Sequence, residues 1–242
     1  MKNERGQISF AAVVLLPLVV MIVGGILILG LALAVEAKAT TACRLRMAKS
    51  QASVGNALAE LTKLNVRAKA LETTRQSALK ALKASIVIPN PAARSAALAL
   101  LKTVELAQAP VRKKQLYWLA KGKQASSMVP SLAKQGVLES IPEGLRPWLK
   151  SARIETRAPS FQMVASSPTH LTPTYFPAPN FQHSQNGVLK WKSTLRNPID
   201  SAVDDFFPEI EFGCSMTLEP VGSGLWAPQP TEDKLSSNSS SS

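Results

Sequence analysis

Two cysteines carry the only candidate for covalent chemistry in this chain of 242 residues. Cys43 and Cys214 are far apart in the sequence, and oxidising conditions outside the cytoplasm would allow them to form a disulfide. The bridge would close a loop of about 170 residues, which the chain-entropy model values at about 5 kcal/mol. Two buried free thiols are the alternative, and the sequence leaves both states open.

Residues suited to metal binding or catalysis do not occur at useful spacings. His170 and His183 lie in a proline-rich segment, with no cysteine or carboxylate at ligand spacing. The acidic residues between 204 and 211 lack the spacing of a calcium loop, so a solvated acidic turn is the simpler interpretation. The sequence also lacks a glycine-rich phosphate loop, a nucleophile elbow and a zinc motif. We therefore predict that the chain is not an enzyme and has no catalytic, metal or cofactor site.

An apolar run from Ile8 to Val35 contains no charged side chain. It exceeds the roughly 20 residues that a helix needs to cross a bilayer. A cleavable secretory signal has a shorter apolar core of about 7–15 residues, so we interpret the run as a membrane anchor. Cleavage at the small residues between Val35 and Ala39 is the alternative.

The start of this run resembles the N-terminus of a known family. The residues Arg5-Gly6-Gln7-Ile8-Ser9-Phe10-Ala11-Ala12-Val13-Val14-Leu15-Leu16-Pro17 are similar to the pilin-like proteins of Tad (tight adherence) pili, of the TadE and TadG type of minor pilin. In that family a short basic leader ends in Gly, a hydrophobic helix follows at once, and a proline often lies part of the way along it.

The resemblance implies how the chain would be processed and assembled. A prepilin peptidase would cut after Gly6 and leave Gln7 as the new N-terminus. The apolar helix would then pack beside those of other pilin-like subunits or the assembly platform. Many family members carry Glu where this chain has Ala11, which cannot pair with a neighbour's amino terminus, so we expect a minor, priming or tip position. A single-pass envelope-anchored scaffold or binding protein with no pilus role is the alternative.

The flanking charges and the resemblance predict opposite orientations. Lys2 and Arg5 precede the run, whereas four cations follow it between residues 38 and 49, and this bias favours a cytoplasmic C-terminal side. The resemblance implies a single-pass protein of the inner membrane with its C-terminal region periplasmic or extracellular. We adopt the second orientation because the leader is very short and the charge bias is a statistical tendency.

Charge is unevenly distributed after the run. Residues 36–153 contain 21 Lys and Arg against 6 Asp and Glu, whereas residues 154–242 contain 5 against 9. We interpret the basic side chains as the solvated face of alanine-rich helices that partly complement the acidic part. An acidic pilus partner, an anionic surface polymer, lipid headgroups and nucleic acid are the functional alternatives. Nucleic acid is the least favoured, since no recognition motif is present and the cluster Arg112-Lys113-Lys114 is short.

The elements that follow the anchor are predicted to be mainly α-helical. From Glu36 to about Ser85 there is no proline, and strong helix formers predominate. If residues 8–84 form one helix, it would be roughly 115 Å long, with Pro17 and Gly24-Gly25 as its bend points. Residues recur near every third or fourth position and form one narrow, mostly apolar stripe: Leu58, Leu61, Leu64 or Asn65, Ala68, Leu71, Ala78 and Leu82.

A second helix is predicted to return along the first. The segment from Ile86 to Pro91 ends the first helix, and a helical pattern then runs from near Ala92 to about Lys123, with Pro110 expected to kink or divide it. Two long helices with a short connection indicate an antiparallel hairpin. Helical turns at Ser127–Lys134 and Leu145–Ala152 would cap it. The apolar members of the second helix are Leu98, Leu101, Val104, Leu116, Trp118 and Leu119.

The character of the sequence changes from about Ile154, since ten of the 17 prolines follow and forbid a sustained helix. Short strands are predicted at Gln162–Ala165, Val188–Lys192 and Glu209–Leu218.

The expected organisation is a leader (1–6), a transmembrane helix (7–35), a basic helical hairpin (36–126), short helices with a proline-rich segment (127–198), a small strand-containing segment (199–226) and a disordered tail (227–242).

Overall fold

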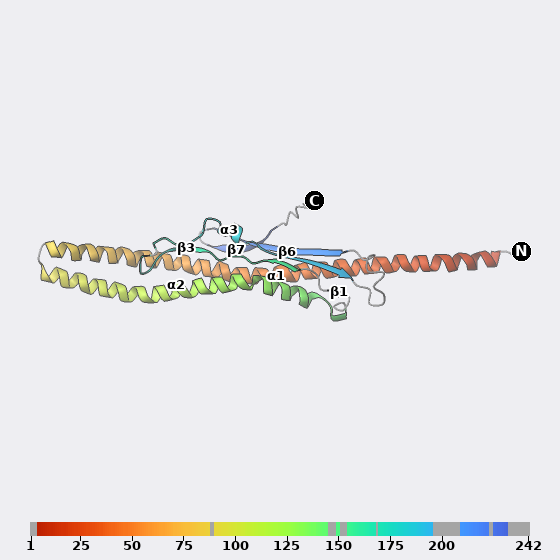
Figure 1. Ribbon diagram of the computed structural model, residues 1–242, viewed down its shortest axis with the longest axis horizontal. Coiled ribbons are helices and arrows are strands. Elements are labelled where there is room, and N and C mark those ends of the chain that lie inside the picture. Colours follow the sequence, from red (N-terminus) through yellow and green to blue (C-terminus); the bar gives the residue numbers. More distant parts are fainter. Residues whose placement is uncertain are drawn as a thin grey trace.

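A computed structural model describes residues 4–87, 90–144, 149–150, 154–167, 169–195, 209–222 and 225–231. Two long helices, α1 (Glu4–Val87) and α2 (Pro91–Ser140), form an antiparallel hairpin. A sheet lies along the middle of α1, and the N-terminal part of α1 projects alone from the other elements (Figure 1). The strands and the short third helix are β1 (Leu149–Lys150), β2 (Ile154–Arg157), β3 (Met163–Ala165), β4 (Tyr175–Pro177), α3 (Phe181–Ser184), β5 (Gly187–Leu195), β6 (Glu209–Pro220) and β7 (Trp226–Pro230).

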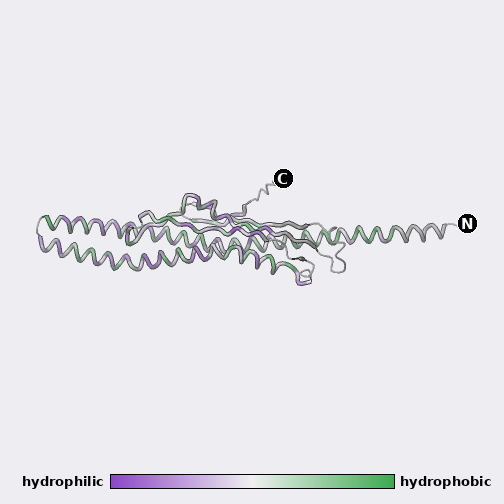
Figure 2. Tube along the Cα trace, viewed as in Figure 1, coloured by the Kyte–Doolittle hydropathy of each residue, from purple (hydrophilic) through white to green (hydrophobic). Residues whose placement is uncertain are grey.

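The first helix confirms the prediction of one element that runs from the apolar segment into the hairpin. α1 is continuous through Pro17 and through Gly24 and Gly25, and it ends at Val87, close to the predicted end. Its first buried residue among those whose side chains are described is Ala39. The apolar part therefore extends without cover from the other described elements, and the packed part begins just after it (Figure 2).

The hairpin turn is closed by a strong N-terminal cap on α2. The Asn90 side chain accepts hydrogen bonds from the backbone N–H groups of Ala92 and Ala93, both at 3.1 Å. Pro91 occupies the first turn, where its missing N–H is not needed. These two residues explain why the chain reverses here and starts a new helix at once.

The second helix is longer and more regular than predicted. Pro110 does not divide it, since α2 runs unbroken from Pro91 to Ser140 with Pro110 and Pro130 inside. The predicted end near Lys123 and the separate turn at Ser127–Lys134 are therefore wrong. Val104 and Gln108 before Pro110, and Gln115 after it, are buried, so both halves are held in place by packing. That packing offsets the cost of about 3 kcal/mol or more for an interior proline.

The seam between the helices is narrow, as the alanine-rich sequence predicts. On α1 the predicted stripe is buried at Leu58, Leu61, Leu64, Ala68 and Ala78, and half-buried at Leu71 and Leu82. On α2 the prediction is right for Leu101 and Val104 but wrong for Leu98 and Leu116, which are exposed. Small and amide residues take the seam positions instead: Ala97, Gln108, Gln115, Gly122, Ala133 and Gly136.

The C-terminal part forms an antiparallel sheet that the sequence only partly predicts. β5 pairs with β6, β6 with β7, and β1 and β2 both pair with β5, while β3 and β4 form a separate ribbon. The three predicted strands correspond to β3, β5 and β6.

The expected helical turn at Leu145–Ala152 is wrong at Leu149–Lys150, which is β1, and its other residues lie outside the described ones. The expected disordered tail is wrong for residues 227–230, which belong to β7, and residues 232–242 lie outside the description.

Two buried clusters join the sheet to the hairpin. The first, next to the apolar segment, contains Cys43 and Met47 of α1, Val129 of α2, Trp191 of β5 and Cys214 of β6. The second, further along α1, is formed by Val54, Leu58, Leu61, Phe161, Phe181 and Leu218. Aromatic residues, leucines and a methionine of the C-terminal part thus supply the apolar bulk that the alanine-rich helices lack.

A glycine on α1 allows the closest approach of the sheet. A Cβ added to Gly55 would lie 2.7 Å from the backbone carbonyl oxygen of Trp226 in β7. We predict that Gly55→Ala lowers the melting temperature of the full chain in detergent and exposes β7 to limited proteolysis, although alanine is favoured by about 1 kcal/mol in a helix. Gly25→Ala is the matched control on the same helix, because nothing lies within 4 Å of its added Cβ. Equal melting of the two variants would contradict the close approach.

Candidate functional site

The exposed apolar surface of α1 is the first candidate site. Large apolar side chains between Leu15 and Leu33 are 49–73% exposed, and they cover the helix on all sides. This is a helix long and apolar enough to cross a membrane. From Leu15 to Ala34 it extends about 30 Å, which matches the hydrocarbon thickness of a bilayer. Gly6 and Gln7, the predicted processing residues, lie in the first turns of the same helix.

A disulfide lies just outside this apolar segment. The structure joins Cys43 of α1 to Cys214 of β6, with the two Cα atoms 6.2 Å apart, so of the two states that the sequence left open it contains the bridge. Both cysteines are buried, and the Cys214 sulfur lies 3.8 Å from the Met47 sulfur. The bond connects the helix to a strand that is paired on both sides, by β5 and by β7. It therefore ties the whole sheet to α1 at the edge of the apolar segment.

Side-chain amides on the helices hold the proline-rich segment in place. Gln51 donates from Nε2 to the backbone oxygens of Gln185 and Met216, at 3.0 and 2.9 Å. Asn65 bonds both backbone groups of Tyr175, donating at 2.7 Å and accepting at 2.9 Å. Gln115 donates to the Pro173 oxygen at 2.9 Å. Backbone groups of the C-terminal part, in loops and at strand edges, thus find hydrogen-bond partners on helix side chains.

The sequence placed Asn65 as a possible member of the stripe, but the hydrogen-bonding role of all three amides was missed, although a signal was present. Gln51, Asn65 and Gln115 occupy positions on or beside the buried stripe, where apolar residues are expected. A polar residue at such a position needs a buried hydrogen-bond partner. Each one therefore indicates that another backbone segment passes over the helix at that point.

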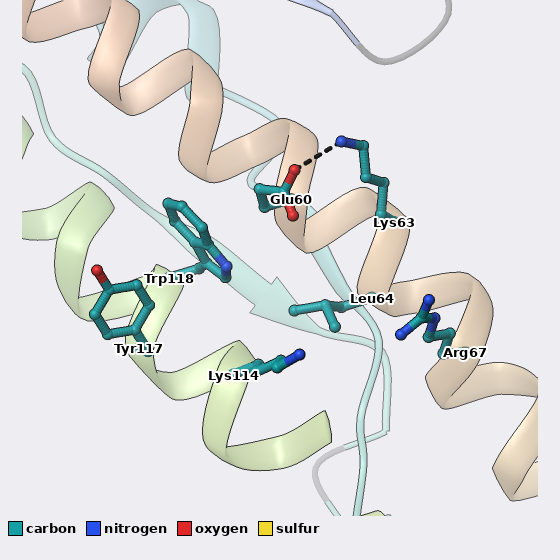
Figure 3. A pocket seen from close by; sticks show the side chains of 7 residues that line it. All are labelled: Glu60, Lys63, Leu64, Arg67, Lys114, Tyr117 and Trp118. Atoms are coloured by element: carbon teal, nitrogen blue, oxygen red, sulfur yellow. Dashed lines mark hydrogen bonds and ion pairs between the residues drawn. The ribbon is translucent and has the colours of Figure 1, made fainter. Parts of the chain in front are cut away.

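A groove between α1 and α2 is the second candidate site. It has a volume of about 420 Å³, and its lining combines cations with aromatic and apolar side chains (Figure 3). The residues that line it are Glu60, Lys63, Leu64, Arg67, Lys114, Tyr117 and Trp118.

The charges in this groove are only partly paired. Glu60 forms an ion pair with Lys63 at 2.7 Å, whereas neither Arg67 nor Lys114 forms an ion pair with a residue that the structure describes. Lys121 lies 4.8 Å from the centroid of the Trp118 ring, and Tyr117 meets the same ring edge-on at 5.2 Å. The sequence identified Trp118 only as a member of the apolar stripe, and the combination of lysines with two adjacent aromatic residues was the signal available.

The histidines and acidic residues do not come together as a metal centre. His170 Nε2 lies 3.9 Å from a carboxylate oxygen of Glu72, and no group of three or more metal-ligating residues occurs in the described part of the chain. Glu209 and Glu211 lie on β6, and the acidic residues at 204 and 205 are outside the described ranges. Among the described side chains of the hairpin, ion pairs neutralise some of the cations locally: Arg46–Glu139, Lys63–Glu60 and Arg75–Glu72.

The disulfide predicts a measurable change in mobility and stability. Full chain treated with an alkylating agent should migrate faster on a denaturing gel without reductant than with it, because the bridge closes a loop with a sequence separation of 171. Removing the bridge with Cys214→Ser should lower the unfolding free energy by up to about 5 kcal/mol. Cys214→Ser should also migrate identically with and without reductant. Full labelling of both thiols in the unreduced, denatured wild-type chain would show that the bridge is absent.

Comparison of the chain with protein-family models, with curated proteins and with solved structures found no match.

Proposed function

We propose that this chain is a membrane-anchored, pilin-like subunit of a Tad-type pilus or a related assembly apparatus, in a minor, priming or tip position. It would be held in the inner membrane by the apolar half of α1, with the hairpin and sheet on the periplasmic or extracellular side. Its role would be assembly, with other pilin-like subunits and the assembly platform as partners, and it would need no catalytic centre or cofactor.

The observation that carries the proposal is the division of one unbroken helix into two halves. The first part of α1 exposes apolar side chains on every side, whereas the second part buries one face against α2 and the sheet. No loop separates the halves, and the disulfide fixes the sheet to the helix at their border. Lateral packing of the apolar halves of neighbouring subunits would therefore array the hairpins and sheets at a set distance and angle.

The apolar half also has features suited to helix–helix contact in a membrane. Gly24, Gly25 and Gly30 have no atom within 4 Å of an added Cβ. Gly30 and Ala34 are four residues apart, a spacing of small residues that lets two helices approach closely in lipid. These residues support association of this segment with another apolar helix.

The disulfide supports the proposed orientation. Structural disulfides persist in the periplasm and outside the cell, whereas the cytoplasm keeps thiols reduced. We weigh it above the cations between residues 38 and 49, because one of them also has a structural role in the hairpin. This residue, Arg46, forms an ion pair with Glu139 of α2 at 2.6 Å.

Processing at Gly6 tests the pilin-like role directly. We predict that the mature chain begins at Gln7 and that Gly6→Leu accumulates as the unprocessed form, because a bulky residue at the cleavage position blocks a prepilin peptidase. The measurement is the intact mass of the purified membrane protein. Gly24→Leu is the control for a similar change within the same helix and should be processed normally.

Other masses distinguish the alternatives. An intact Met1 in the wild-type chain, or a mature mass that Gly6→Leu does not change, would reject the pilin-like role and favour an anchored scaffold or binding protein. A start near Lys38 or Thr40 would indicate a cleaved signal sequence and a released product.

A separate experiment tests the orientation. In spheroplasts, we predict that external protease digests the hairpin and sheet of the wild-type chain while a cytoplasmic marker protein stays intact. Protection of the hairpin and sheet, together with full labelling of Cys43 and Cys214, would place them in the cytoplasm and reject the assembly role.

A further inference from the structure

Two cations from facing helices enter one groove without an ion-pair partner. Arg67 of α1 and Lys114 of α2 both reach toward the space beside Leu64 (Figure 3). Neither forms an ion pair or hydrogen bond with a residue that the structure describes. Both side chains are exposed, so an anion placed between them would be attracted by both.

The rest of the lining determines which anion would fit. Leu64 is 6% exposed and forms an apolar floor, and half-buried Trp118 forms one wall. The indole nitrogen of Trp118 faces the groove (Figure 3), and it has no hydrogen-bond partner among the described residues. A carboxylate would accept hydrogen bonds from Arg67, Lys114 and this indole, while an apolar group beside it would cover Leu64.

We propose that this groove binds an acidic peptide segment of a partner protein, with a carboxylate between Arg67 and Lys114 and a neighbouring apolar side chain on Leu64. The lining carries three cations, Lys63, Arg67 and Lys114, against the single carboxylate of Glu60. The site is therefore complementary in charge to an acidic segment. A side-chain carboxylate next to an apolar residue, as in an amphipathic acidic peptide, satisfies both the charged and the apolar parts of the lining.

The position and shape of the groove disfavour other anions. Glu60 lies 25 residues beyond Val35, about 37 Å along the helix, so headgroups of the anchoring membrane cannot reach the groove. Single-stranded nucleic acids are bound by positively charged grooves with open aromatic faces for stacking. Here Lys121 covers one face of Trp118, and Tyr117 meets its ring edge-on.

The inference does not depend on the pilin-like role, since the groove lies outside the apolar segment and would serve an anchored scaffold equally well. Gly6 processing and peptide binding are measured separately, so failure of one proposal leaves the other intact.

The test selects ligands for the full chain in nanodiscs from a displayed library of random dodecapeptides. Counter-selection uses the Arg67→Glu/Lys114→Glu variant. We expect the recovered peptides to be enriched in Asp and Glu next to apolar residues. A labelled synthetic copy of a recovered peptide should bind the variant at least about tenfold more weakly than the wild-type chain in a fluorescence anisotropy titration at physiological salt. It should also shift the Trp118 indole N–H resonance, assigned with Trp118→Phe.

The matched control separates this site from general attraction to a basic protein. Lys69→Glu/Lys113→Glu makes the same charge change on exposed positions of the same two helices that do not line the groove. This control should weaken binding by less than about twofold at that salt concentration. Its circular dichroism melting curve, compared with that of the Arg67→Glu/Lys114→Glu variant, shows whether both remain folded.

Several outcomes would overturn the proposal. These are equal weakening in the two charge-reversed proteins, recovery of peptides without acidic residues, or binding that leaves the Trp118 resonance unchanged. A selection that recovers no peptide, together with tight binding of a polyuronate or of single-stranded DNA to the wild-type groove, would likewise reject a peptide ligand.

Discussion

The packing of α1 against β6 is the contact on which the rest of the molecule depends. Alanine-rich helices bury little apolar area against each other, and the seam between α1 and α2 is filled largely by Ala, Gly and amide side chains. The largest buried groups lie where the sheet covers the helices, as with Trp191, Met216 and Leu218. Since burial of apolar area is the main favourable term in folding, the hairpin gains most of its stability where the sheet lies on it.

This contact makes two parts of the chain interdependent. The sheet has no separate apolar core, because Leu189, Trp191, Met216 and Leu218 all belong to clusters that contain residues of the helices. The helices in turn supply polar partners to irregular backbone through Gln51, Asn65 and Gln115. Beyond Glu72 and Gln108, which are hydrogen-bonded to each other at 3.3 Å, the two helices continue with alanine, leucine and valine in the seam. The molecule therefore has a well-packed middle and a thinner far end.

The sequence predicts the elements that depend on contacts between nearby residues better than those that depend on contacts between residues far apart in the chain. Local signals were sufficient for the helices, for the turn at Asn90 and Pro91, and for three of the strands. The prediction of a break at Pro110 was wrong because contacts with α1, which is far away in the sequence, offset the cost of a proline inside a helix. β2, β4 and β7 were missed since two of them contain proline and all are short, so only pairing with β5, β3 and β6 defines them. Of the candidate site, the apolar helix could be predicted from composition, whereas the groove requires the register of α1 on α2.

The disulfide also determines how the molecule would carry a mechanical load. A force applied between the membrane helix and the C-terminal strand would pass along α1 to Cys43 and then directly to Cys214 through a covalent bond. Residues 44–213 would lie outside this path, so the hairpin and most of the sheet would bear no tension. Only the helix before Cys43 and the part of β6 and β7 after Cys214 would be stretched. A chain of this design could be pulled by its apolar helix without unfolding the hairpin.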